Sequence, residues 1–465
     1  MSSTSPPSSL EADPRDRLPR VLGLGDASML VVASVVGSGI FFTPAQVAAL
    51  LPGAGWILAA WIVGALISLA GAFANAELGA MFPQAGGDYV YLREGLHPAA
   101  GFLVGWLSFF AIYTGTIAAL AVVFAESLAP TLGLERPGII GLASFAILVC
   151  SLLNLRGTRW GASLNNLTSG AKVVALLAFV LIAPIMGEGS FAPWSAEAIA
   201  ESGDVAGGGW FAFGQALSPI LFSYLGWNAC VYVASEIEDP TRNLPRALFL
   251  GLAICSALYV VVNLVYLYAL TPAELRGSVD AGAAAAHSLF GPVGARWVSA
   301  FVLVSVLGTL NATVLVGPRI VYAMALDGMF LRRADRVHDG FRTPSAAIGV
   351  QALVSIALVV FLESFPRALD FTVFGIVLAT TADVVTLFVL RWREPGRARP
   401  FRAWGYPWVP ALYLLVNLAI GAAIAFSRPR EAAVTLGLLA VGLLVYGAFM
   451  RPAPRSSGSG ATPGG

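Results

Sequence analysis

Apolar runs of about 20 residues follow one another along most of the chain, separated by short polar loops. A helix of that length crosses the roughly 30 Å hydrocarbon core of a lipid bilayer. Only 11% of the residues are charged, against roughly 25% in a soluble domain. The sequence therefore predicts an all-α polytopic membrane protein whose surroundings are the lipid bilayer.

The lengths of these runs predict about 12 transmembrane helices. The expected helices are 25–50, 54–80, 98–128, 137–155, 163–186, 210–236, 246–270, 292–326, 344–363, 368–390, 408–427 and 431–450. Helices 1–10 form an expected core at 23–390, and a basic loop with helices 11–12 follows at 391–450. The polar segments 1–22 and 451–465, rich in Ser and Pro, are expected to be disordered tails.

Most of the 27 basic residues fall in loops on the side of the chain that also carries both tails. Basic residues in short loops mark the cytoplasmic side of a membrane protein. We therefore expect both termini in the cytoplasm and a multi-pass protein of the cytoplasmic (inner) membrane. The basic residues are dispersed along the chain, so no nucleic-acid partner is expected.

The first expected helix contains "VVASVVGSGIFFTPA" (31–45), with Gly37 and Gly39 in its middle. Glycine inside a helix costs about 1 kcal/mol relative to alanine, so the segment either packs closely against another helix or is broken. Five helices later, "LFSYLGWNACVYVASE" (221–236) places Gly226 among polar residues at mid-span. Transporters built from inverted repeats place broken helices at such corresponding positions. Breaks in helices 1 and 6, within two inverted five-helix repeats, are the favoured interpretation, and close packing is the alternative.

A broken helix leaves backbone groups that lipid cannot satisfy. N–H groups at the start of a half-helix suit a carboxylate, and here they belong to Ser38, Gly39 and Ile40. Carbonyl groups suit an ammonium, and those near the two breaks belong to Val35, Phe222, Ser223 and Leu225. Glycine at 37, 39 and 226 lets the backbone approach a ligand closely. Together these groups predict a site for the zwitterion of an α-amino acid.

Lys172 is the only lysine in the chain and falls inside the expected fifth helix. An ionisable residue at membrane depth is a candidate functional group, although a lysine can also extend to the interface. In the functional interpretation, the ammonium of Lys172 replaces a bound cation. It would bond carbonyl groups of helix 1 near Val36 and a hydroxyl of helix 8, either Ser305 or Thr309. Such a lysine could also titrate during transport.

The residues that usually hold metals or perform catalysis are few and scattered. His97, His287 and His338 have no partner at metal-ligand spacing. The three cysteines, Cys150, Cys230 and Cys255, match no zinc or redox spacing. We expect no cofactor, no metal site and no enzymatic activity, because no nucleophile–base or metal constellation faces a common site.

Five stretches of the sequence carry a family resemblance. They are "VVGSGIFFTPA", "ELGAMFPQAGGDYVYLREGLHP", "AKVVALLAF", "FSYLGWNACVYVASEIEDPTRNLPRAL" and "GTLNATVLVGPRIVYAMALDGMF". Together they resemble the amino acid–polyamine–organocation superfamily, and within it the sequence looks most like the L-type amino acid transporters. The resemblance implies the LeuT-like fold of five plus five helices and sodium-independent exchange of amino acids.

The resemblance also implies roles for particular residues. Phe222 would be the gate that closes over the substrate, and Asn228 would lie just beyond the break and link helix 6 to its neighbours. Lys172 would stand where sodium-coupled relatives hold an ion. The implied contacts of the substrate are Ser38 and Gly39 for its carboxylate, and the carbonyls of Val35, Phe222 and Leu225 for its amine.

Three departures from the L-type pattern affect partners and substrate size. The loop "APTLGLERPG" between helices 3 and 4 lacks the cysteine that tethers a heavy chain in eukaryotic light chains, so no heavy-chain partner is expected. Leu225 stands where those light chains often have glycine, which would narrow the side-chain pocket. Helix 3, which would supply the rest of that pocket around Tyr113, Thr116 and Leu120, aligns only loosely with the L-type pattern.

The expected function is a secondary transporter of neutral L-amino acids that works by exchange with alternating access. A neutral substrate is favoured because no acidic or additional basic residue falls beside either break. A proton-coupled symporter with Lys172 as the titrating group is the alternative within this class. A membrane sensor that binds an amino acid without transporting it is the more distant alternative.

Overall fold

The computed structural model describes residues 17–51, 53–192, 209–278, 280–362, 365–427 and 429–449. Across these residues the chain is almost entirely helical, and the pairing of extended segments is limited to an isolated bridge between Leu22 and Ile237. The all-α class predicted from the apolar runs is therefore confirmed. Most of the two expected tails falls outside the described residues.

Each of the twelve expected helices coincides with one helix or with a set of consecutive helical segments. Within the described residues, eight helices are long and apolar enough to cross a membrane, or nine if the bent pair at the start counts as one span. The helical segments are α1 (Leu24–Val35), α2 (Gly39–Leu50), α3 (Ala54–Met81), α4 (Asp88–Gly95), α5 (Pro98–Leu107), η1 (Ser108–Tyr113), α6 (Thr114–Leu132), α7 (Arg136–Leu155), α8 (Thr158–Met186), α10 (Gly209–Tyr224), α11 (Ala229–Tyr232), η3 (Ala234–Glu236), α12 (Pro240–Ala269), α13 (Pro272–Gly277), α14 (Ala281–Val316), α15 (Pro318–Leu326), η4 (Arg332–Asp335), α16 (Ser345–Leu362), α17 (Phe365–Arg393), α18 (Trp408–Ser427) and α19 (Pro429–Phe449).

Both helices that were predicted to be broken are interrupted. α1 ends at Val35 and α2 begins at Gly39, with a bend of 45° between the two segments. α10 ends at Tyr224, and helical structure resumes only at Ala229 with the four-residue α11. Gly226 lies in this gap with a φ of 96°, a conformation that residues with a Cβ rarely adopt. The backbone conformation at the break in helix 6 therefore favours glycine at position 226.

Two expected helices show features that bear on packing. α14 consists of two helices that meet at a kink at Gly291, which is not helical and has a φ of 71°, so the expected start at 292 coincides with the start of the second of them. The helix expected at 98–128 contains a stretch of π-helix, η1, in its middle. Between the expected helices 246–270 and 292–326, the structure has α13 and the first part of α14.

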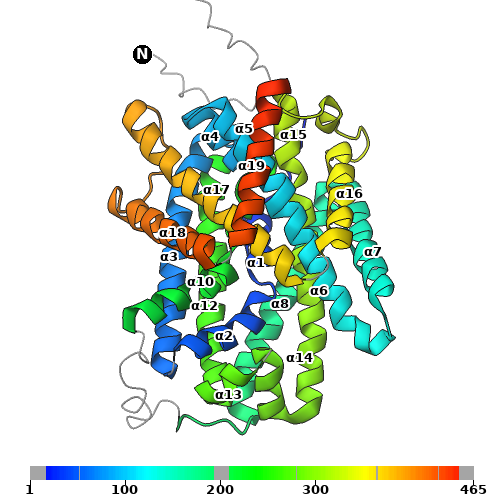
Figure 1. Cartoon of the computed structure of the whole chain (residues 1–465), viewed down its shortest axis with the longest axis vertical. Helices are drawn as coiled ribbons and strands as arrows, with labels where there is room; N and C mark the ends of the chain where they lie inside the picture. Colours follow the sequence, from blue (N-terminus) through cyan, green and yellow to red (C-terminus); the bar gives the residue numbers. More distant parts are fainter. Residues whose placement is uncertain are drawn as a thin grey trace, which may run out of the picture.

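The interrupted helices lie inside the bundle. α1 packs against α8 and α12, and α10 packs against α2 and α3. In Figure 1, α1 and α10 lie near the centre of the molecule, with α3 on one side and α6 and α14 on the other. Backbone groups freed by the breaks are therefore surrounded by protein, as membrane depth requires.

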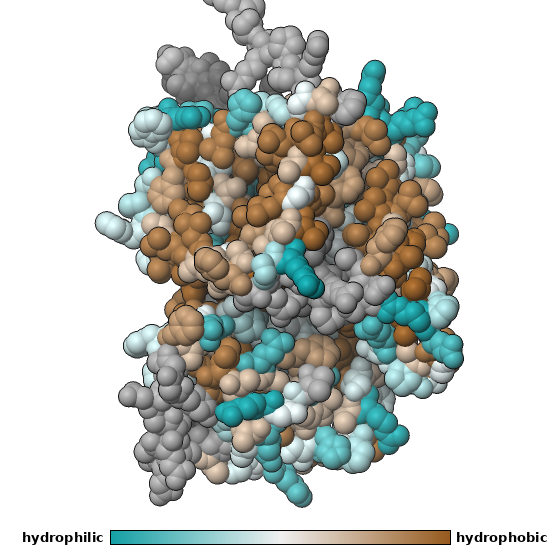
Figure 2. All heavy atoms as spheres, viewed as in Figure 1, coloured by the Kyte–Doolittle hydropathy of each residue, from teal (hydrophilic) through white to brown (hydrophobic). Residues whose placement is uncertain are grey.

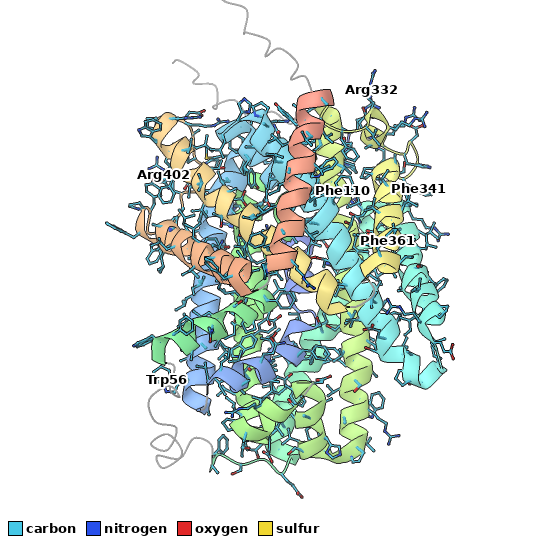
Figure 3. All side chains as sticks on the ribbon, in the orientation of Figure 1. Trp56, Phe110, Arg332, Phe341, Phe361 and Arg402 are labelled. Carbon is cyan, nitrogen blue, oxygen red and sulfur yellow. The ribbon has the colours of Figure 1, made fainter. Side chains whose placement is uncertain are left out.

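The periphery of the molecule is apolar over a broad zone. Figure 2 shows apolar side chains gathered over α16 and α19, with hydrophilic residues above them. Phe361 on α16 and Leu444 on α19 are among the large apolar side chains exposed there. In Figure 3, Arg332 and Arg402 lie in the upper half of the molecule and Trp56 lies at its lower end. The apolar surface confirms a multi-pass membrane protein, because lipid is the solvent that such a surface needs.

Residues 17–22, which belong to the expected N-terminal tail, pack on the structured part of the chain. The N–H groups of Val21 and Leu22 both donate to the carbonyl of Glu236 at 2.9 Å, and the N–H of Glu238 donates to the carbonyl of Leu22 at 2.9 Å. The side chains of Leu18 and Leu22 are buried. The described chain thus begins by binding the end of the interrupted helix 6.

Candidate functional site

The two interrupted helices touch at Gly39. A Cβ placed on Gly39 would lie 2.7 Å from Oγ and 2.8 Å from Cα of Ser223, which is on α10. The hydroxyl of Ser223 in turn donates to Oγ1 of Thr43 on α2 at 2.8 Å. Helix 1 is broken before Gly39, and its second half, α2, also packs closely against α10. Helix breakage and close helix packing, the two interpretations of the glycines, therefore both apply to Gly39.

α2 starts with N–H groups that have no acceptor within the helix. The N–H of Phe41 donates to the carbonyl of Ser38 at 3.1 Å and is the first donor of the helix. The N–H groups of Ser38, Gly39 and Ile40 precede it, and a helix leaves its first N–H groups without intrahelical acceptors. These groups carry the positive end of the helix dipole, which favours an anion such as a carboxylate.

A cavity of about 130 Å³ lies beside the two breaks. It is smaller than the roughly 300–1,000 Å³ of pockets that take drug-sized ligands. The predicted site residues in its wall are Val35, Gly37, Ser38, Gly39, Tyr113, Thr116, Leu120, Phe222, Ser223, Leu225, Gly226, Asn228 and Thr309. The predicted site residues outside its wall are Val36, Ile40, Lys172 and Ser305. The structure therefore brings helices 1, 3, 6 and 8 to one small cavity.

Tyr259 on α12 connects the two breaks, and the sequence analysis did not identify it. Its hydroxyl oxygen lies 2.7 Å from the carbonyl of Val35 and 3.0 Å from the carbonyl of Ser223. The carbonyl of Val35 also accepts the N–H of Gly37 at 2.8 Å. Because a carbonyl has two lone pairs, an ammonium at Val35 would displace one of these donors. The carbonyl of Phe222, which accepts the N–H of Leu225 at 3.0 Å, keeps a lone pair for a ligand.

Gly226 and Asn228 shape the break in helix 6. A Cβ on Gly226 would lie 2.8 Å from the carbonyl oxygen of Ser34, so helices 1 and 6 also meet there through their backbones. The amide of Asn228 lies 3.5 Å from the hydroxyl of Tyr232, one turn further along the same segment. This contact of Asn228 is thus within its own segment, whereas the resemblance implied a link to neighbouring helices.

Lys172 on α8 points into the protein and not toward the membrane interface. Its side chain is fully buried, and Nζ donates to the carbonyl of Ala33 at 3.2 Å and to that of Val36 at 2.7 Å. Nζ also bonds Oγ1 of Thr309 at 2.8 Å. The other hydroxyl considered from the sequence, Ser305, bonds the carbonyl of Val36 at 3.3 Å. An ammonium therefore satisfies the carbonyl groups at the C-terminal end of α1.

Helix 3 reaches the cavity through the π-helical segment η1. Such segments occur mostly as single turns inside α-helices and often at functional sites. Here η1 ends at Tyr113, which lies in the cavity wall together with Thr116 and Leu120 from the following helix α6. Hydrophobic periodicity does not reveal a single extra residue, so the sequence offered no signal for η1.

Threonines form a polar strip that the sequence analysis missed in part. Thr309 and Thr313 lie one turn apart on α14, and Thr372 and Thr380 lie two turns apart on α17; all four line the cavity. Thr313 donates to the carbonyl of Thr309 at 2.8 Å, and Thr380 to that of Ile376 at 2.9 Å. Threonines at helical spacing inside apolar runs were the signal that could have identified this strip.

The cavity wall also contains a carboxyl group. The sequence analysis considered only the residues beside the two breaks and expected no acidic residue there. Asp88, the first residue of α4, lies in the wall, and Oδ2 of Asp88 accepts a hydrogen bond from the hydroxyl of Tyr232. The ring of Tyr232 packs edge-on against that of Tyr113, with centroids 5.2 Å apart. Burial raises the pKa of Asp88 to about 6. Asp88 is distant from both breaks in the sequence, so only the fold places it there.

A buried ion pair lies next to the end of helix 6. Nε of Arg319 bonds Oε1 of Glu236 at 2.7 Å, and both side chains are almost completely buried. The hydroxyl of Thr158, at the start of α8, donates to Oε2 of Glu236 at 2.6 Å. The carbonyl of Glu236 holds the N-terminal segment at Leu22. This network therefore ties α8, α15 and the N-terminal segment to helix 6.

An all-helical membrane bundle in which two broken helices meet at a small, partly polar cavity defines a membrane transport protein. Residues 22–449 match the family described as amino acid permease. The match covers most of the chain, and the chain belongs to this family. The family resemblance drawn from the five sequence stretches is therefore confirmed.

Curated relatives agree with this assignment. The chain is 30% identical over 435 residues to the serine/threonine exchanger SteT of Bacillus subtilis, covering 92% of this chain and 96% of the relative. It is 28% identical over 438 residues to the large neutral amino acids transporter small subunit 2 of Mus musculus, covering 92% and 81%. The Asc-type amino acid transporter 1 of Mus musculus is 26% identical over 461 residues, covering 96% and 84%.

Proposed function

We propose that this protein is a secondary transporter of neutral L-amino acids that works by sodium-independent exchange. The observation that carries the proposal is the junction of α2 with α10. The N–H groups of Ser38, Gly39 and Ile40 begin one half-helix, and Phe222, whose carbonyl keeps a lone pair for a ligand, lines the same cavity as Ser38 and Gly39. A carboxylate and an ammonium on one carbon atom match these two sets of groups.

Lys172 supports sodium independence. Its ammonium donates to two carbonyls of α1 and contacts a hydroxyl of α14. Carbonyl and hydroxyl oxygens are the ligands that a sodium ion would take, and a fixed ammonium satisfies them without one. Helix 1 is then held in its broken form in the absence of an added ion.

The size and lining of the cavity support a small or medium neutral substrate. Its volume is about 130 Å³, and Leu225, Tyr113, Thr116 and Leu120 surround the space beside the break. In this proposal they contact the substrate side chain, and Phe222 closes over the substrate. One relative is named a serine/threonine exchanger and another an Asc-type amino acid transporter, which fits a small substrate.

We further propose that the chain works without a heavy chain, in the cytoplasmic membrane, with both termini inside. One relative is named a small subunit. In this chain all three cysteines are buried, so none is available for a disulfide to a second protein. The excess of arginines on the side of the tails supports the orientation.

Reconstitution tests the proposal. Purified protein in vesicles preloaded with one amino acid should take up a labelled amino acid, and a panel of all twenty should identify the neutral substrates by competition. Uptake should be unchanged when sodium is replaced by an organic cation. Uptake into empty vesicles as fast as into preloaded ones would rule out exchange, and binding without counterflow would indicate a sensor.

Proton-coupled symport is the second candidate function. The observation that favours it is the position of Lys172, which is buried with hydrogen-bond partners that carry no charge. An ionisable group at membrane depth is a candidate for binding and releasing a proton during transport. A pH gradient across empty vesicles should then drive accumulation of the amino acid, which exchange alone does not predict.

A further inference from the structure

Two buried carboxyl groups from distant parts of the chain meet at the end of the cavity. Asp88 begins α4, and Asp383 lies in the middle of α17. Both side chains are almost completely buried, and α4 packs against α17, which brings the two carboxyl groups within reach of each other. Asp88 also lines the cavity, so the pair has a route to it.

The hydrogen bonds around the pair lack one donor. Oδ2 of Asp88 accepts from the hydroxyl of Tyr232, and Oδ2 of Asp383 accepts from Nδ2 of Asn75 at 3.1 Å. Among the described residues, Oδ1 of Asp88 and Oδ1 of Asp383 have no hydrogen-bond partner, although both atoms are buried. An ionised carboxylate can only accept hydrogen bonds, so two facing carboxylates repel each other. One shared proton supplies the missing donor and removes one of the two charges.

Among the residues that the structure describes, no positively charged side chain pairs with Asp88 or Asp383. The groups that face it are the neutral side chains of Tyr91, Tyr113, Tyr232, Tyr413 and Cys230. The other buried carboxylates behave differently: Glu236 pairs with Arg319 at 2.7 Å and Glu77 pairs with Arg391 at 2.6 Å. Arginine thus neutralises the buried carboxylates of Glu236 and Glu77. At Asp88 and Asp383, a proton is the remaining means of neutralising one charge.

A proton fits the geometry better than a metal ion. A proton supplies the single hydrogen-bond donor that two facing carboxyl groups lack, whereas a metal ion needs more oxygen ligands than this pair offers. Within the part of the chain that the structure describes, no group of three or more His, Cys, Asp or Glu side chains could hold a metal ion.

We propose that Asp88 and Asp383 form a binding site for one proton at the end of the substrate cavity, and that release of this proton into the cavity loosens α4 from α17. Release breaks an O–H bond of the shared proton and leaves two carboxylates in contact. Their repulsion opens this end of the cavity and speeds exchange. The proposal rests on the function proposed above, because the exchange rate is its readout.

The first experiment measures exchange in vesicles with the same pH on both sides, from about pH 5 to pH 8. The exchange rate of the unmodified protein should rise several-fold with pH. Asp383→Asn should be slow and independent of pH, because the amide donates the hydrogen bond that the shared proton supplies and leaves the same net charge. Asp88→Asn tests the pair from the other side and should behave in the same way. Asp339→Asn, an exposed carboxyl group, should keep the rising profile.

A second measurement needs no transport and covers the case in which a variant fails to fold. The infrared C=O stretching band of a protonated carboxyl group should be present in the unmodified full-length protein, should titrate over the same pH range, and should be lost in Asp383→Asn. Absence of this band, or a pH profile that survives in both asparagine variants, would overturn the proton site. A sodium requirement that both variants remove would show that the pair holds sodium and would also overturn it. If the unmodified protein exchanges no amino acid at any pH, the proposed function fails, and the infrared titration still decides on the proton.

Discussion

Gly37 and Gly39 lie two residues apart at the break in helix 1, but different neighbours surround them. A Cβ on Gly37 would lie 3.5 Å from Oγ1 of Thr309, which is an ordinary contact. A Cβ on Gly39 would lie within 2.7–2.9 Å of three atoms of Ser223. Glycine is therefore required at position 39 because α10 approaches too closely for a side chain. This requirement holds whether or not a ligand binds there.

Gly39→Val should abolish substrate binding while the protein remains inserted and folded. The added side chain separates α2 from α10 and displaces the N–H groups proposed to hold the carboxylate. We expect binding to weaken at least tenfold, equivalent to about 1.4 kcal/mol, as measured by ligand-induced thermal stabilisation. Gly170→Ala, on α8 with open space around it, is the control and should bind normally. Normal binding by Gly39→Val would refute the site.

Lys172→Ala should reduce transport far more than it reduces expression. The substitution removes the ammonium donor of the carbonyls of Ala33 and Val36 and leaves them only the hydroxyls of Thr309 and Ser305, and a hydrogen bond to a charged group contributes about 1.5–3 kcal/mol. Helix 1 should lose its fixed broken form, and the exchange rate should fall at least tenfold. Val174→Ala, on the exposed face of the same helix, should exchange like the unmodified protein. Unchanged exchange by Lys172→Ala would show that the ammonium is dispensable.

Phe222→Ala should slow translocation without preventing membrane assembly. Phe222 lies in the cavity wall at the end of α10, where its ring can cover a bound substrate. We expect exchange in vesicles to fall several-fold with little change in the amount of inserted protein. Phe361→Ala removes an aromatic ring from the lipid-facing surface of α16 and serves as the control. Exchange at the unmodified rate would assign Phe222 to packing alone.

Sequence reasoning located the two helix breaks because glycine inside an apolar run is a local signal. Gly37, Gly39 and Gly226 could be read without any knowledge of their neighbours. Tyr259 and the pair of Asp88 with Asp383 could not, because their partners lie far away along the chain. An isolated tyrosine or aspartate in a helix carries no information about the residue that it will face.

Among the helical elements, α3 and α7 were predicted almost to the residue, because glycine, proline or a turn bounds each apolar run. α12 begins at Pro240 and not at 246, since its first turns are polar and resemble a loop. The π-helical η1 was missed because one extra residue barely changes the apolar pattern. Polar first turns and π-segments are both places where tertiary packing sets the helix.

The contributions of Arg319 and Glu236 to the free energy of unfolding should depend on each other, although the two residues lie on different helical segments. Removing Arg319 with Arg319→Met leaves Glu236 buried without its partner, which costs about 3–5 kcal/mol. Adding Glu236→Gln to that variant should restore part of the loss, so the double-mutant cycle in thermal unfolding should show strong coupling. The exposed pair of Arg397 and Glu394 is the control, with an expected effect below about 1 kcal/mol. Additive losses at Arg319 and Glu236 would contradict the pair.

At the scale of the whole molecule, the two ends of helix 6 are held very differently. At one end of the break, α10 meets α2 through backbone and hydroxyl contacts. Beyond the other end, Glu236 joins Arg319, Thr158 and the segment at Leu22. In the proposed transport cycle, the network at Glu236 must open for the substrate to leave on that side.

The single chain should be sufficient for exchange. All three cysteines are buried, so assembly with a disulfide-linked partner is not expected. Protein purified alone and reconstituted in vesicles should exchange amino acids, and adding a reducing agent should leave the rate unchanged. Activity that appears only when a second membrane protein is co-expressed would contradict this expectation.

The contact of Gly39 with Ser223 also limits how such a protein can evolve. The groups proposed to hold the charged part of an amino acid are peptide N–H and C=O groups, which every residue type except proline possesses. Changes of substrate must therefore arise in the surrounding walls, at Tyr113, Thr116, Leu120 and Leu225, or along the threonine strip of α14 and α17. One fixed backbone frame can thus serve relatives with different substrates, since selection acts only on the side chains around it.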